Sequence, residues 1–140
     1  MVHALERSRQ HLVPGGVLIC IRPHRWKRPF IAVTAPGRRQ PVGALINNAF
    51  EPLISSADDA IRTVVEGRRF ALIGKSHHRF RVQLGSLAEL HQYFHQGQRP
   101  PRFPSGSRQR LHALWRARPN GARIEVTEFL SVIALRALEQ

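Results

Sequence analysis

The 140-residue sequence predicts a single domain of the α/β class that covers residues 1–140. Three observations predict this class. Residues 17–21 form an unbroken apolar run with β-branched side chains, which is typical of a strand covered on both faces within an α/β sheet. Ser86-Leu87-Ala88-Glu89 is a capping box, the usual start of a helix. Residues 123–138 have mainly strand character, so helices and strands occur in one chain.

The first third of the chain predicts a helix, a strand and an insertion. Leu5 and Leu12 lie at helical spacing, and a Pro-Gly-Gly turn ends that helix because proline cannot continue it. The apolar strand over 17–21 follows. Residues 22–52 then form a loop and hairpin insertion, in which two strands flank a six-residue connection.

The rest of the chain alternates between strands and helices. Ser56 is a suitable cap for a helix, and Asp58 and Asp59 suit its first turn because a helix start favours negative charge. A turn at 74–76 separates two short strands. The expected elements are a helix over 57–66, strands over 70–73 and 80–84, a helix from the capping box to Gly97, a loop over 98–107, a helix over 107–117 and a strand over 123–138.

The chain is strongly basic, with 22 Lys and Arg against 9 Asp and Glu and a net charge of +13. Nearly all of this excess is arginine, which pairs with phosphate and carboxylate groups. A solvated basic surface and a polyanion-binding surface both stay open. The single cysteine, Cys20, excludes disulfides within the chain and zinc sites that need two or more cysteines.

No apolar run approaches the length of a membrane span, so a soluble cytoplasmic protein without membrane contact is expected. No metal is expected either. His91 and His95 have the i, i+4 spacing of metal ligands, but Gln92 replaces the glutamate of a metalloprotease motif. These histidines are therefore interpreted as surface residues.

The basic loop that follows the first strand carries the candidate substrate- or anion-binding residues: Arg22, His24, Arg25, Trp26 and Arg28. Trp26 is the aromatic residue embedded in this loop. Its ring suits stacking on a base or a ligand ring, or packing against its own domain. No catalytic residue can be assigned.

The run Leu12-Val13-Pro14-Gly15-Gly16-Val17-Leu18-Ile19-Cys20-Ile21 resembles the turn and fifth strand of class I S-adenosylmethionine-dependent methyltransferases. The resemblance implies part of a Rossmann-like fold, with a mixed sheet and an antiparallel closing strand. It also implies S-adenosylmethionine as the cofactor of intact relatives. Their Gly-rich cofactor loop would precede Met1, so the resemblance implies a truncated or split relative that cannot bind the cofactor alone. The loop over 22–28 would then face the substrate.

Two alternatives come from other functional classes. The first is a nucleic-acid-binding module that uses Arg22, Arg25, Trp26, Arg28, Arg38 and Arg39. The second is a non-enzymatic interaction subunit. Half of a wound sheet would leave an unpaired edge, and such an edge favours a protein partner or self-association.

Overall fold

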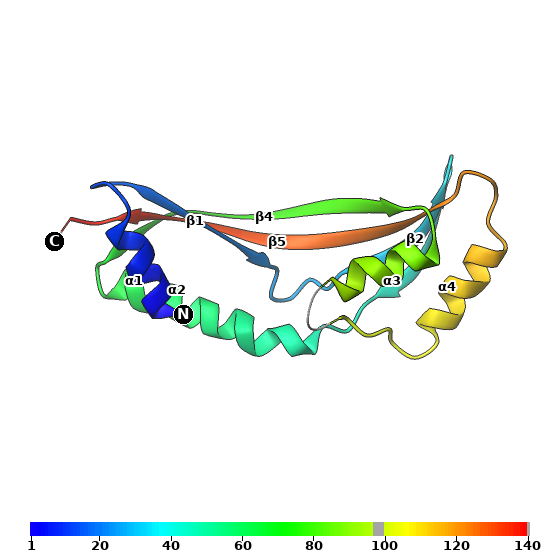
Figure 1. Ribbon diagram of the computed structural model, residues 1–140, viewed down its shortest axis with the longest axis horizontal. Helices are drawn as coiled ribbons and strands as arrows, with labels where there is room; N and C mark the ends of the chain where they lie inside the picture. The colour runs from blue at the N-terminus through cyan, green and yellow to red at the C-terminus, as the bar shows by residue number, and fades with distance from the viewer. Residues whose placement is uncertain (97–99, 140) are drawn as a thin grey trace. The chain divides into compact units, whose positions relative to one another are not determined.

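The computed structural model describes residues 1–96 and 100–139 of the chain (Figure 1). The predicted helix end at Gly97 lies outside these residues. The contacts of the chain divide it into two compact units, and each is described by itself below. Unit 1 comprises residues 1–25, 51–78 and 130–140, and unit 2 comprises residues 26–50 and 79–129.

The chain contains helices and a five-stranded sheet, which confirms the α/β class. The elements are α1 (Val2–Gln10), β1 (Val17–Pro23), β2 (Phe30–Ala35), β3 (Arg38–Ala44), the 3-10 turn η1 (Asn48–Phe50), α2 (Glu51–Glu66), β4 (Phe70–Leu84), α3 (Leu87–His95), α4 (Ser107–Arg116) and β5 (Arg123–Ala137). None of the described helices is both long enough and apolar enough to cross a bilayer.

The sheet is antiparallel, so the expectation of a partly parallel, mixed sheet was wrong. β5 pairs with β1 in unit 1 and with β2 in unit 2, and β2 continues to β3. β4 lies along the other edge of β5 and runs in the opposite direction (Figure 1). The apolar run that favoured a parallel sheet carries no information about strand direction, because direction depends on the connections between strands.

β1 is a strand, as predicted, but it is not covered on both faces. β1 lies at one end of the strand order β1-β5-β2-β3, and its residues alternate between exposed and half-buried. Val17, Ile19 and Ile21 are 43%, 52% and 64% exposed, whereas Leu18 and Cys20 pack against the core of unit 1. An unbroken apolar run is therefore compatible with a strand that leaves one apolar face exposed.

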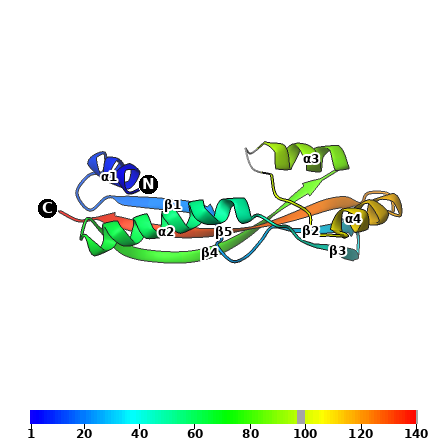
Figure 2. The same cartoon turned by 90° about the horizontal axis from the view of Figure 1, so that it is seen from below.

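The core of unit 1 lies between its strands and its two helices. Val64 of α2 packs with Phe70 of β4 and with Leu135 of β5, and Leu5 of α1 packs against this cluster. α2 runs along the strands of this unit (Figure 2). α2 begins at Glu51, six residues before the predicted start. Pro52 is compatible with this start because the first turn of a helix lacks internal N–H partners.

The predicted hairpin within 22–52 is present but tighter than expected. Only Pro36 and Gly37 separate β2 from β3, and Gly37 has a positive φ of 69°. Proline followed by a residue with positive φ is typical of a type II turn. The two ends of the expected insertion belong to regular elements, since β1 extends to Pro23 and α2 starts at Glu51, whereas residues 24–29 form a loop.

The prediction of a turn at 74–76 was wrong, because β4 is one continuous strand. Gly74 lies inside it, where an added Cβ would be 3.7 Å from the Cβ of Ala134. Glycine is tolerated in a strand where a neighbouring strand approaches closely. A glycine followed by two polar residues is typical of a turn, but pairing with β5 keeps this segment in an extended strand.

In unit 2, α3 and α4 cover one face of the strands. Leu90 and Phe94 of α3 and Leu111 and Trp115 of α4 join the core, with Val126 of β5 beneath them. Half of the predicted capping box is confirmed: the Ser86 hydroxyl accepts a hydrogen bond from the Glu89 N–H at 3.0 Å. The Glu89 carboxylate accepts its own bond from the Gly85 N–H at 2.7 Å instead of that of Ser86.

Candidate functional site

The five predicted anion-binding residues are divided between the two units. Arg22, His24 and Arg25 belong to unit 1, whereas Trp26 and Arg28 belong to unit 2. The Trp26 side chain is 69% exposed.

The two arginines of unit 1 share one carboxylate. Arg22 forms an ion pair with Asp58, and Arg25 Nη1 lies 3.4 Å from the other oxygen of the same side chain. Asp58 was expected in the first turn of its helix, but it lies in the middle of α2, where it faces β1. These two arginines therefore hold β1 and the loop after it against α2, and the carboxylate offsets one of their two positive charges.

A serine and two histidines lie near this ion pair in unit 1. Ser131 Oγ, on a residue only 5% exposed, is 3.2 Å from His77 Nδ1. The rings of His77 and His24 lie 4.7 Å apart. A hydrolytic triad also needs a carboxylate to orient the histidine. Within the described residues, no carboxylate contacts His77, and no group of three potential metal ligands occurs.

The positive charge is concentrated in unit 2. Its residues include thirteen Lys and Arg but only three Asp and Glu, a net +10, whereas unit 1 has nine against six, a net +3. No acidic residue occurs anywhere between Leu90 and Ile124, and this interval contains seven arginines. We call residues 90–124 the acid-free segment.

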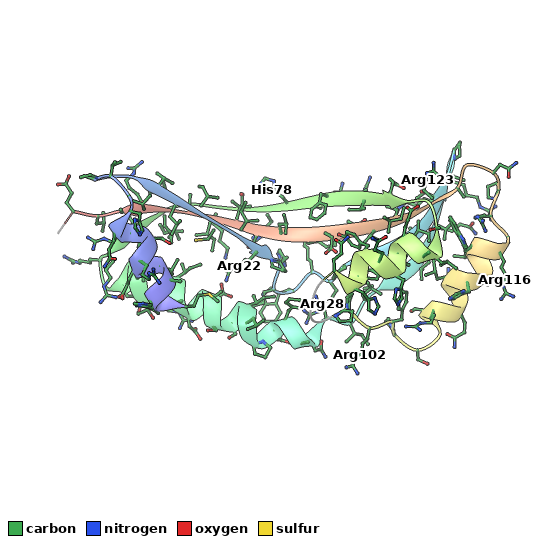
Figure 3. All side chains as sticks on the ribbon, viewed as in Figure 1. Arg22, Arg28, His78, Arg102, Arg116 and Arg123 are labelled. Atoms are coloured by element: carbon green, nitrogen blue, oxygen red, sulfur yellow. The ribbon has the colours of Figure 1, made fainter. Side chains whose placement is uncertain are left out.

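α4 is the helix of the acid-free segment, and its two sides differ in chemistry. Leu111 and Trp115 are buried against the strands of unit 2. Arg108, His112 and Arg116 are exposed and follow one another at intervals of four residues, so they share one side of the helix. We call these three residues the basic face of α4. Figure 3 shows Arg116 on this helix and Arg102 in the segment that leads to it.

Two neighbouring arginines have structural contacts. Arg110 Nε donates to the Pro41 carbonyl at 2.9 Å, and the Arg118 guanidinium lies 4.0 Å from the centre of the Trp115 ring. Arg108 and Arg116 form no ion pair with any carboxylate in the described part of the chain. Their charge is therefore available to a ligand from solution.

The opposite face of the unit 2 sheet is also basic, but its charges are partly neutralised. Glu125 is 5% exposed, and its carboxylate accepts hydrogen bonds from Arg39 Nε at 2.9 Å and from Gln83 Nε2 at 3.0 Å. Arg81 Nε lies 3.8 Å from the same group. Arg39, one of the residues of the predicted nucleic-acid site, is thus engaged within the fold, while Arg38 is exposed near the hairpin turn.

A cavity of about 210 Å³ lies between α3 and α4. Its walls are mostly apolar or aromatic, and two members of the basic face also line it. The lining side chains include His91, Phe94, His95, Phe103, Arg108 and His112. His91 and His95 are exposed, as predicted, and their rings stack 3.8 Å apart.

The sequence contains a signal for the basic face of α4, although the predicted binding residues lie elsewhere in the chain. Arginine is denser in the loop over 22–28, with three in seven residues, than in the acid-free segment, with seven in 35, so arginine density alone favours the loop. The distinguishing feature is the distribution of acidic residues. Asp58 is 36 positions from Arg22 in the sequence yet neutralises it, and only the tertiary structure reveals that pairing.

Comparisons with protein-family models, with curated proteins and with solved structures found no match to this chain.

Proposed function

We propose that this chain is a nucleic-acid-binding protein and that it contacts phosphates through the basic face of α4. The observation that carries the proposal is the exposed row of Arg108, His112 and Arg116, within a segment that has no acidic residue. Arginine donates paired hydrogen bonds to phosphate. A row of basic side chains along a helix suits a polymer whose phosphates recur at regular intervals.

The distribution of charge supports binding over a merely solvated surface. Several arginines elsewhere in the fold lie next to carboxylates, as with Arg22 and Asp58 or Arg39 and Glu125. Unpaired positive charges near one another repel and lower the stability of the folded state, unless a partner compensates them. A polyanion would remove this repulsion, and its release of counterions would drive association.

The methyltransferase resemblance leads to a second proposal. It would make the chain a truncated or split relative in a partial Rossmann-like fold, with S-adenosylmethionine as the cofactor of the completed protein. The antiparallel pairing of β1 and its exposed apolar face do not favour it. Tight binding of S-adenosylhomocysteine to the isolated chain, measured by calorimetry, would show that the chain has a cofactor site.

A role as an interaction subunit is favoured by one observation in unit 1. β1 lies at one end of the strand order and exposes an apolar row formed by Val17, Ile19 and Ile21. Exposed apolar rows and unpaired strand edges favour association with another chain. Light scattering would detect a dimer of this chain, and the Ile19→Lys variant would dissociate it. A native monomer at all concentrations would exclude self-association through this row.

The salt dependence of oligonucleotide affinity tests the nucleic-acid proposal. Phosphate contacts by the two arginines of this face on a single strand predict a slope of about −1.4 when the logarithm of the association constant is plotted against that of salt concentration. Affinity should then fall about sevenfold between about 50 and 200 mM salt. Fluorescence anisotropy of a labelled 12-nucleotide strand would measure this slope. Absence of binding at the lower salt concentration would contradict the proposal.

A further inference from the structure

We propose that the cavity between α3 and α4 receives a single unpaired nucleobase, so that the protein prefers single-stranded nucleic acid to a duplex. This inference rests on the proposed function and adds the class of substrate to it. The cavity belongs entirely to unit 2, and its lining residues come from α3, α4 and the segment between them.

The size of the cavity suits one ring system. Its volume of about 210 Å³ is below the roughly 300 Å³ at which pockets for drug-sized ligands begin. A planar base is small enough for such a space, whereas a stacked base pair is not. Bases within a duplex are also paired, and extracting one costs a few kcal/mol, which disfavours duplex binding.

The walls of the cavity have the chemistry that bases recognise. Phe94 and Phe103 meet edge to face with ring centres 6.4 Å apart, and the Arg108 guanidinium lies 5.2 Å from the Phe103 ring centre. His91 and His95 present stacked imidazole rings tilted by only 15°. Bases in single strands stack on aromatic rings, on histidine and on arginine planes.

The cavity and the phosphate-binding row share residues. Arg108 and His112 line the cavity, and both also belong to the basic face of α4. A strand whose phosphates follow this face would therefore pass the cavity mouth. This adjacency is the reason to assign the cavity to a base of the bound strand instead of to an unrelated small molecule.

Three labelled 12-nucleotide ligands separate this inference from the proposed function. The first is single-stranded oligothymidine, the second has the same backbone with abasic sites, and the third is a duplex. We expect the native chain to bind the normal strand about tenfold more tightly than the abasic strand. The His91→Ala/His95→Ala variant should bring this ratio close to one, while His3→Ala/His11→Ala, which removes two exposed histidines from unit 1, should not change it.

Each outcome has a distinct meaning. Equal affinity of the native chain for normal and abasic strands overturns the base pocket but leaves phosphate binding intact. An unchanged ratio in the His91→Ala/His95→Ala variant, with a native circular dichroism spectrum, also overturns it. Failure of all three ligands to bind overturns the proposed function itself.

Discussion

Tyr93 and Glu128 of unit 2 are coupled through a partly buried hydrogen bond. The Tyr93 hydroxyl donates to Glu128 Oε1 at 3.2 Å. Burial, followed by the nearby charge and hydrogen bond of Glu128, raises the pKa of Tyr93 to about 12. Burial also raises the pKa of Glu128, while the bond from Tyr93 lowers it. Both groups therefore favour their protonated forms in the folded state.

Tyr93 is the only tyrosine of the chain, so phenolate absorbance reports on it alone. We expect a titration midpoint near 12. The folded state holds this proton more tightly than the unfolded chain, in which the pKa is about 10. The free energy of unfolding should therefore fall as the pH rises from about 10 to about 12.

The Glu128→Gln variant removes the charge but keeps a polar partner for the hydroxyl. Its phenolate midpoint should lie below that of the native chain, though above 10, because burial remains the largest cause. The same absorbance titration measures it. A native midpoint near 10 would contradict the described environment of Tyr93, and an unchanged midpoint in Glu128→Gln would show that the two groups are not coupled.

Removal of the Glu125 carboxylate should lower the free energy of unfolding more than removal of an exposed carboxylate. Its oxygens bind Arg39 and Gln83, and truncation to alanine would leave these donors without their acceptor. We expect Glu125→Ala to lower the free energy of unfolding by about 2 kcal/mol in urea titrations. Asp59→Ala removes a mostly exposed partner of Arg62 and should change it by less than about 0.5 kcal/mol. Equal losses would contradict the account of Glu125.

Two serines test the positions of the helix starts. Ser86 caps α3, so Ser86→Ala should lower the free energy of unfolding by about 1 kcal/mol. Ser56 was expected to be a cap, but it lies inside α2, where alanine is the better helix former. Ser56→Ala should therefore leave stability unchanged or raise it by up to about 0.5 kcal/mol. A loss of about 1 kcal/mol in Ser56→Ala would favour the later helix start.

At the scale of elements, local patterns predicted most helices and strands because their signals are local. The capping box at Ser86 and the apolar spacing of α4 depend on neighbours within a few residues. The merger of two short strands into β4 and the exposure of one face of β1 depend on distant pairing. No local pattern contains that information, so these features could not be predicted.

The same limit applies to the candidate site. The arginines after β1 were recognised by their density, but their pairing with Asp58 is a tertiary contact. The cavity between α3 and α4 also depends on how two helices meet, although each helix was predicted. Only the absence of acidic residues from 90–124 could have been read from the sequence.

Nucleic-acid binding through α4 depends on where the positive charge of the protein lies and not on how much charge there is. Unit 2 carries a net +10 and unit 1 a net +3. A nonspecific attraction between a basic protein and a polyanion would respond to the total charge of +13 wherever it is reduced. A defined phosphate-binding face would respond to the position of the removed arginines.

Two double variants with the same net charge measure this difference most directly. Arg108→Ala/Arg116→Ala changes the basic face of α4, whereas Arg7→Ala/Arg62→Ala removes two exposed arginines from the helices of unit 1. In anisotropy titrations of the labelled strand over a range of salt, the first variant should reduce the steepness of the salt slope by about 1.4 and weaken binding. The second should bind like the native chain. Equal effects of the two variants, or a loss confined to Arg7→Ala/Arg62→Ala, would contradict a phosphate-binding face on α4.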